Sequence, residues 1–141
     1  MKAKSAFLVI FLMISVFSFG QSLGRIVGGT SPSTTTIEKA IQNIKAAEQF
    51  KSLSDQATLA NALQGAVLLK YFTQVVAGSN KTFLLETTRG IECFRVYNRF
   101  DGYKRVINYA RGDDEEEVLA QCLSFRNMKS KAELRTLALA P

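Results

Sequence analysis

Residues 66–110 read AVLLKYFTQVVAGSNKTFLLETTRGIECFRVYNRFDGYKRVINYA, and this stretch decides the fold. It is rich in β-branched and aromatic residues, and breaks that contain glycine recur at short intervals. The pattern predicts strands at about 66–77, 82–88, 91–99 and 103–110. The breaks are Gly78-Ser79-Asn80, Arg89-Gly90 and Asp101-Gly102. Strands joined by such short connections form an antiparallel meander.

A helix is expected before the meander. Residues 30–36 are polar and offer helix N-caps. Apolar residues then recur every three to four positions, at Ile37, Ala40, Ile41, Ile44, Ala47 and Phe50. This spacing predicts an amphipathic helix that ends near Leu53, and residues 54–65 either extend it or form a second short helix. The expected class is α+β, with one long helix packed on an antiparallel β-meander of four to five strands.

The order of these elements places distant residues together. Successive turns of a meander alternate between the two ends of its sheet. The turn at Gly78 and the loop at Asp101-Gly102 are therefore expected at one end, and Arg89-Gly90 at the other. If the helix runs from the first end to the far end, the segment before it, with Gly28, also starts near Gly78. Three separate parts of the sequence would then form one edge.

Two short motifs fall on this predicted edge. Residues 74–78 read Gln-Val-Val-Ala-Gly, and residues 25–29 read Arg-Ile-Val-Gly-Gly. The first resembles the Q-x-V-x-G binding loop of the cystatins, which are reversible protein inhibitors of papain-like cysteine proteases. The second is similar to the N-terminal trunk of secreted cystatins. The resemblance covers roughly residues 24–122, as ordered landmarks rather than continuous identity.

The resemblance implies a wedge that enters the protease cleft and blocks the catalytic cysteine. The trunk would follow the non-primed side of the cleft, and Gly28 would let the backbone turn away near the thiol. The hairpin would pack near the cleft centre, and such a preformed wedge loses little entropy on binding. The implied protease-binding residues are Ile26, Val27, Gly28, Gly29, Gln74, Val75, Val76, Ala77, Gly78, Arg99 and Phe100.

The second hairpin loop departs from the family pattern. Secreted cystatins usually carry Pro-Trp there, and this chain contains no tryptophan. The corresponding loop is residues 98–103 or lies later in the chain. Phe100 either replaces the indole as an apolar contact or turns into the core, and the sequence leaves both open. The departure favours an alternative, a non-inhibitory cystatin-fold secreted binding or host-defence protein.

The N-terminus predicts secretion. Lys2 and Lys4 precede an apolar run over residues 6–17, and small residues follow, so residues 1–20 are expected to be a cleaved signal peptide. The expected parts of the mature chain are a trunk at 21–36, a cystatin-like domain at 37–123 and a C-terminal tail at 124–141. In an extracellular protein, Cys93 and Cys122 are predicted to form a disulfide.

Several function classes are not expected. Residues 25–29 also resemble the activation site of trypsin-like zymogens, but the chain has no histidine to accept the serine proton. We predict no enzyme activity, no cofactor and no metal. The acidic run at 113–117 is expected to be a solvated loop, because its carboxylates lack the spacing of a calcium loop. Loss of Lys2 and Lys4 lowers the net charge from +6 to +4, too little to argue for nucleic acid.

The resemblance to cystatins implies cathepsin-type proteases as the partners. They would be bound by a secreted monomer that has no membrane contact after signal cleavage. One possible modification lies close to the predicted edge. Asn80-Lys81-Thr82 is an N-glycosylation sequon. A glycan on Asn80 would stand two residues beyond Gly78 and obstruct the cleft.

Overall fold

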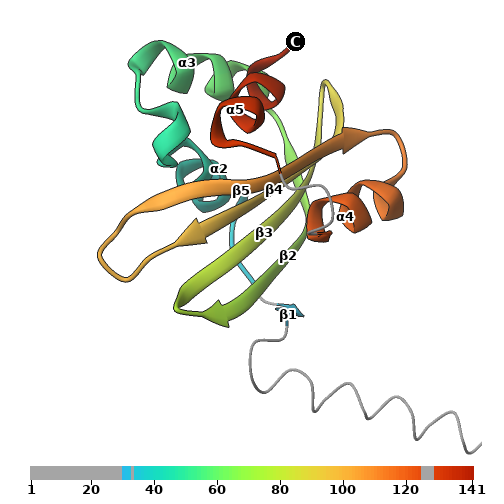
Figure 1. The fold of residues 1–141 in the computed structure, drawn as a ribbon. Helices are drawn as coiled ribbons and strands as arrows, with labels where there is room; N and C mark the ends of the chain where they lie inside the picture. The colour runs from blue at the N-terminus through green and yellow to red at the C-terminus, as the bar shows by residue number, and fades with distance from the viewer. Residues whose placement is uncertain (1–29, 33, 125–128) are drawn as a thin grey trace, which may run out of the picture.

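The computed structural model describes residues 30–32, 34–124 and 129–141. Its centre is an antiparallel sheet whose strands follow in chain order, β1-β2-β3-β4-β5 (Figure 1). The strands are β1 (Thr30–Pro32), β2 (Val67–Val76), β3 (Gly78–Thr87), β4 (Gly90–Asn98) and β5 (Lys104–Gly112). The α+β class and the meander are confirmed. Strand β3 begins at Gly78 rather than near Thr82, because Gly78 already pairs with Val76.

The predicted long helix is broken. Helix α2 (Ile37–Lys45) is followed by a 3-10 turn, η1 (Glu48–Phe50), and then by α3 (Leu53–Ala62). Ser52 starts a new helix because its backbone is extended and its hydroxyl accepts a hydrogen bond from the Asp55 amide at 3.1 Å. Ala47 and Phe50 are nevertheless buried. Their spacing therefore continues the apolar pattern of α2 across a break that the pattern cannot reveal.

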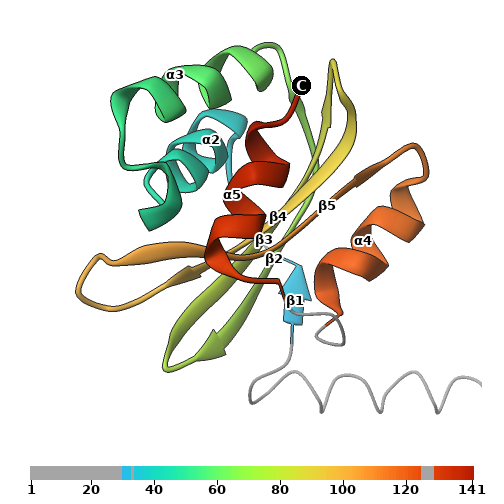
Figure 2. The same cartoon turned by 45° about the horizontal axis from the view of Figure 1, so that its top comes forward.

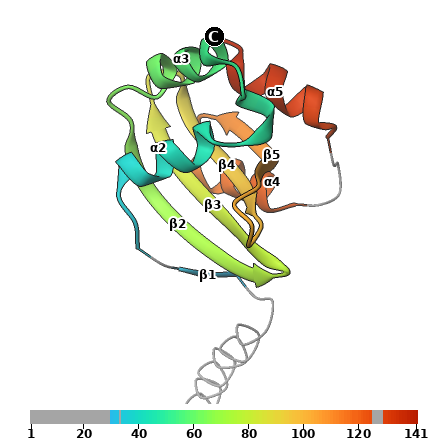
Figure 3. The same cartoon turned by 90° about the vertical axis from the view of Figure 1, so that its left-hand side faces the viewer.

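Helices cover both faces of the sheet (Figures 2 and 3). One face, which we call the inner face, is covered by α2, η1, α3 and α5 (Lys131–Leu139). The other, the outer face, is covered by α4 (Glu115–Leu123). The larger side chains of the inner core are Ile44, Phe50, Leu59, Leu63, Phe83, Leu85, Phe94, Val96, Val106, Tyr109 and Leu134. The buried outer core comprises Leu84, Cys93, Ala110, Val118 and Cys122. Successive strand residues point to opposite faces, which is why Leu84 and Leu85 belong to different cores.

The C-terminal residues expected to form a tail contribute to the core. Leu134 and Ala138 of α5 are 1% and 0% exposed. Arg89 forms two hydrogen bonds with the buried carboxylate of Glu92, and its Nη1 donates to the carbonyls of Ala138 and Ala140 at 2.9 and 2.8 Å. Arg89 thereby supplies donors to carbonyls at the C-terminal end of α5, where helix acceptors lack partners within the helix. We call the Arg89–Glu92 pair and these carbonyls the C-terminal clasp.

The acidic run at 113–117 does not form the solvated loop that was expected. Asp114 is the N-cap residue of α4, and Glu115, Glu116 and Glu117 form the first turn. Negative side chains at this position interact favourably with the positive end of the helix dipole. The run therefore begins a helix. Within the described ranges, no group of cysteine, aspartate or glutamate side chains is arranged to hold a metal ion.

Candidate functional site

Two turns lie side by side at one end of the sheet (Figures 1 and 3). We call residues 74–78 loop 1 and residues 99–103 loop 2. Gly78 touches the base of loop 2: a Cβ on this glycine would lie 2.5 Å from the carbonyl oxygen of Asn98 and 3.3 Å from the Cα of Arg99. Its φ of +116° is also a conformation that other residues rarely adopt. The expectation that these turns share one end of the sheet is confirmed.

Loop 1 presents an apolar tip to solvent. Val75 is 69% exposed and Val76 is 39% exposed, and Ala77 is exposed as well. The Tyr97 hydroxyl donates to the Ala77 carbonyl, so the turn is held against β4. Adjacent exposed apolar residues on a fixed turn are typical of a surface that binds a partner.

Gln74 has a different place from the other loop 1 residues. Its side chain lies on the outer face, where Oε1 accepts hydrogen bonds from Arg95 Nη2 at 2.6 Å and from Asn80 Nδ2 at 3.0 Å. Gln74 is thus an anchor of loop 1 rather than part of its exposed tip. Sequence reasoning missed Arg95, and the one available signal was a charged residue between the apolar Phe94 and Val96 of a predicted strand.

Hydrogen bonds between its own residues hold loop 2, and Phe100 is exposed to solvent there. Phe100 is 87% exposed, so it does not turn into the core. Arg99 donates twice to the Asp101 carboxylate, at 2.9 Å to Oδ2 and 3.0 Å to Oδ1, and lies over the ring of Tyr103. Arg99, followed by the Tyr103 amide, lowers the pKa of Asp101 to about 2. Asp101 is therefore ionised throughout the neutral and mildly acidic range.

A second set of contacts joins loop 2 to the helices of the inner face. The Tyr103 hydroxyl donates to Glu48 of η1, and Lys131 at the start of α5 pairs with the same carboxylate at 2.8 Å. The hydrogen bonds from Lys131 and Tyr103 lower the pKa of Glu48 to about 2. Loop 2 is thus joined directly to η1, and to α5 through the Glu48 carboxylate.

The segment before α2 enters the sheet at the same end. Strand β1 pairs with β2, and Thr30 lies opposite Gln74. Helix α2 crosses the sheet from β2 towards β5 (Figure 3) rather than running from one end to the other. The approach to loop 1 therefore comes from the β1 pairing and not from the direction of the helix. The predicted trunk residues Ile26, Val27, Gly28 and Gly29, and the predicted signal peptide, lie outside the described residues.

The sequon asparagine is enclosed. Asn80 is 8% exposed, and its amide nitrogen, the atom that would carry the glycan, donates to Gln74. A glycan on this nitrogen would not fit the enclosed site and would disturb its hydrogen bond with Gln74, so the fold described here requires an unmodified Asn80. We therefore expect Asn80 to be unmodified, which would leave loop 1 unobstructed.

The two cysteines lie against each other. Cys93 on β4 and Cys122 on α4 are buried in the outer core as free thiols. Burial raises the pKa of the Cys93 thiol, and its hydrogen bond with Cys122 raises it further. Their disulfide stays a prediction, since both residues are free thiols in the structure.

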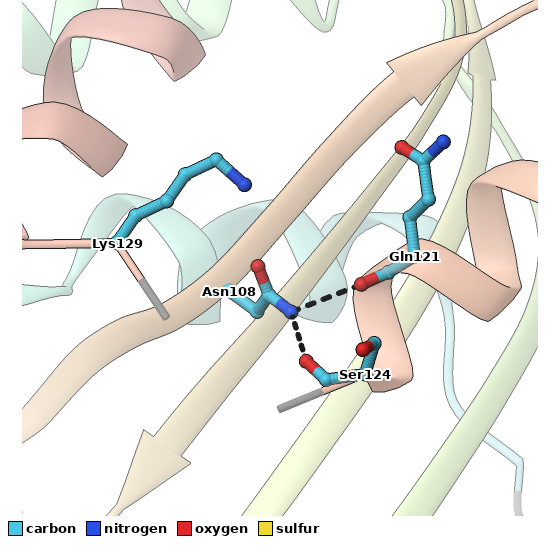
Figure 4. Close-up of a pocket in the computed structure, with 4 residues that line it drawn as sticks. All are labelled: Asn108, Gln121, Ser124 and Lys129. Atoms are coloured by element: carbon cyan, nitrogen blue, oxygen red, sulfur yellow. Dashed lines mark hydrogen bonds between the residues drawn. The ribbon is translucent and has the colours of Figure 1, made fainter. Parts of the chain in front are cut away.

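A hollow of about 200 Å³ near the end of α4 has a structural explanation (Figure 4). Its lining includes Asn108, Gln121, Ser124 and Lys129. Asn108 Nδ2 donates to the carbonyls of Gln121, Cys122 and Ser124 at 3.1, 2.9 and 2.9 Å, and so satisfies the end of α4. Asn108 was not predicted from the sequence. The hollow is therefore a feature of the helix end and not part of the candidate site.

Comparison with known proteins assigns no family. No family model matches the chain, and no curated protein matches it. Among the helices of the described ranges, none has the length and apolar character that a membrane crossing requires.

Proposed function

We propose that the mature chain is a secreted, reversible inhibitor of papain-like cysteine proteases with a cystatin-like fold. Loop 1, loop 2 and the N-terminal trunk form the wedge that enters the cleft. The observation that supports this function best is the exposed apolar tip of loop 1 beside the exposed Phe100 of loop 2.

The physical properties of this edge suit a narrow cleft. Val75, Val76 and Ala77 are small apolar side chains that lose water on entering it, and Phe100 offers the large aromatic surface that often dominates a binding free energy. Tyr97 and Asp101 already hold the two loops in the free protein. Binding then immobilises few additional groups, which reduces its entropic cost.

Other roles for the same fold are less well supported. A host-defence precursor that releases its C-terminal peptide would have to remove α5, whose Leu134 and Ala138 belong to the inner core. A non-inhibitory binding protein is the closest alternative, because loop 2 lacks Pro-Trp. A direct inhibition assay separates this alternative from the proposal.

The test is titration of papain and of an L-type cathepsin with unglycosylated residues 21–141. We expect competitive inhibition that dilution reverses, with the inhibitor recovered intact. Val75→Asp should abolish it, because a carboxylate at the tip would be desolvated without a partner. Val67→Asp is the matched control on the same strand: Val67 is also exposed, at 55%, but lies at the far end of β2. Wild-type protein that leaves both proteases active at micromolar concentration would refute the proposal.

A further inference from the structure

We infer that Arg95 is a positioning residue for loop 1, and that α4 acts through Arg95 as a brace for the binding edge. The inference deepens the proposed function and rests on it. Arg95 would touch no protease: its effect would be exerted through Gln74.

Arg95 connects loop 1 to the outer-face helix. It lies on β4 and is 2% exposed, and it is the largest of the fully buried side chains among the described residues. One guanidinium nitrogen, Nη2, donates to Gln74 Oε1 at 2.6 Å, and the other, Nη1, donates to the Leu123 carbonyl at 3.2 Å. Leu123 is the last residue of α4, and Gln74 is the first of loop 1.

The energetics favour a fixed arrangement. A guanidinium removed from water is strongly destabilising unless its donors are bonded. Its bonds to neutral oxygens are charge-assisted and therefore stronger than ordinary hydrogen bonds. The C-terminal end of α4 carries partial negative charge, which favours a cation at Leu123. Arg95 is thus held by the helix and in turn holds Gln74.

Gln74 transmits this restraint to the exposed tip. Its Oε1 accepts from both Arg95 and Asn80, while Val75 and Val76 follow directly in the chain. Without Arg95, loop 1 would populate several conformations, and only a fraction would fit the cleft. Apparent affinity falls in proportion to the competent fraction. If that fraction must form before docking, the loss appears in the association rate, whereas the dissociation rate is unchanged.

The experiment compares Arg95→Gln with two controls by stopped-flow inhibition of papain. We expect Arg95→Gln to lower the association rate constant about tenfold and to leave the dissociation rate constant within about twofold. Val75→Ala, which removes a direct contact, should instead raise the dissociation rate constant. Asn108→Ala removes another side chain that binds the end of α4 without contacting Gln74. It loosens the end of α4 that anchors Arg95 but leaves the Arg95–Gln74 hydrogen bond in place. It should therefore lower the melting temperature and slow association much less than Arg95→Gln does.

A second readout does not depend on inhibition. Amide hydrogen exchange of residues 75–79 in the free protein should accelerate in Arg95→Gln, and by much less in Asn108→Ala, in which Arg95 still bonds Gln74. Unchanged exchange in Arg95→Gln would overturn the inference even if wild type inhibits no protease, so the two proposals can fail separately. An equal loss of association in Asn108→Ala would also overturn it, because general loosening of α4 would then suffice.

Arg95→Gln is a buried substitution and could prevent folding. Gln74, which is only partly buried, then tests the same link from the loop 1 side. Gln74→Glu keeps an acceptor for Arg95 and should preserve the association rate, whereas Gln74→Leu removes the acceptor and should lower it about tenfold. Equal association rates for these two variants would contradict a positioning role for Arg95.

Discussion

Among single residues, Gly78 has the strictest requirements. Its φ is +116°, and a Cβ would meet the Asn98 carbonyl at 2.5 Å. Gly102 offers a comparison within the same edge: its φ is +94°, but no heavy atom beyond its two chain neighbours lies within 4 Å of the position that a Cβ would occupy. Position 78 requires glycine both because its φ is positive and because no space is left for a Cβ, whereas position 102 requires it for its φ alone.

We therefore predict different costs for the two alanine substitutions. Gly102→Ala should lower the free energy of unfolding by about 1–2 kcal/mol, the cost of a left-handed backbone at a residue with a Cβ. Gly78→Ala should cost about 2–4 kcal/mol, because β3 and β4 must also separate. Urea unfolding of both variants measures the difference. Equal losses would show that the contact with Asn98 is relieved without cost.

Phe100 is the residue whose role the sequence left open. Because it is 87% exposed, Phe100→Ala should change the free energy of unfolding by less than about 0.5 kcal/mol. It should weaken protease binding by more than about 1 kcal/mol if loop 2 enters the cleft. Melting temperature and inhibition constant, measured on the same preparation, separate the two effects. A stability loss of core size would mean that Phe100 is buried in solution.

At the scale of elements, the C-terminal clasp decides whether α5 belongs to the fold. Glu92 is fully buried and accepts from Arg89, from the Tyr109 hydroxyl at 2.6 Å and from the Thr87 hydroxyl. Removal of Arg89 would leave this carboxylate without its counter-ion and the α5 carbonyls without a donor. The clasp therefore couples one buried charge to the docking of a whole helix.

We predict that Arg89→Met lowers the free energy of unfolding by about 3–5 kcal/mol, the usual cost of breaking a buried ion pair. The matched control is Arg135→Ala on the exposed side of α5. Arg135 pairs with Asp55 at 2.8 Å but is 46% exposed, so its loss should cost less than about 1 kcal/mol. Similar losses for the two variants would argue against the clasp. Chemical denaturation followed by far-UV circular dichroism provides both values.

Helix α4 brings the two cysteines together, and oxidation is testable directly. Intact-mass measurement of protein expressed through an oxidising secretory pathway should show the two-hydrogen deficit of one Cys93–Cys122 bridge, which reduction removes. In reduced protein, the raised pKa of the buried Cys93 thiol should make alkylation slow until the chain unfolds. Rapid alkylation of both thiols in native secreted protein would contradict the predicted bridge.

At the scale of the whole molecule, the features set by neighbouring residues could be predicted from the sequence, whereas those set by long-range contacts could not. The meander and its turns follow from strand alternation and glycine breaks, which are properties of neighbouring residues. The break after α2 was hidden because Ala47 and Phe50 still face the core. Its consequence is long-range: η1 places Gln49 so that its amide bonds both the N–H and the carbonyl of Val106 on the edge strand β5.

The candidate site shows the same contrast between features that the sequence predicts and features that depend on long-range contacts. Loop 1 and loop 2 could be placed together from topology, because hairpin turns alternate between sheet ends. The roles of Arg95 and Asn108 could not, because each depends on where the end of α4 lies in space. The packing of α5, which lies within the segment 124–141 expected to be a tail, could not be predicted for the same reason. Leu134 becomes a core residue only through contacts with elements far away in the sequence.

The charge distribution of the whole chain leads to a pH prediction. The chain has no histidine, whose side chain would change its charge between about pH 5 and 8. The carboxyl pKa values of Glu48 and Asp101 are both lowered to about 2, from ordinary values of 4.5 and 3.8. The folded state therefore binds their protons less tightly than the unfolded state does. Stability from these groups is fully present above the unfolded values and decreases as the pH falls through about 4 towards 2.

We accordingly expect the urea midpoint to be nearly constant from pH 8 to about pH 5.5 and to fall at pH 3. The double variant Glu48→Gln and Asp101→Asn should be less stable than wild type at pH 7 but should lose less on acidification, since it has no such carboxylates to protonate. Loop 2 should also keep its ionic contacts at pH 5.5, so inhibition should persist there. A steep loss of stability between pH 7 and 5.5, or an unchanged acid sensitivity in the double variant, would show that other groups control the pH response.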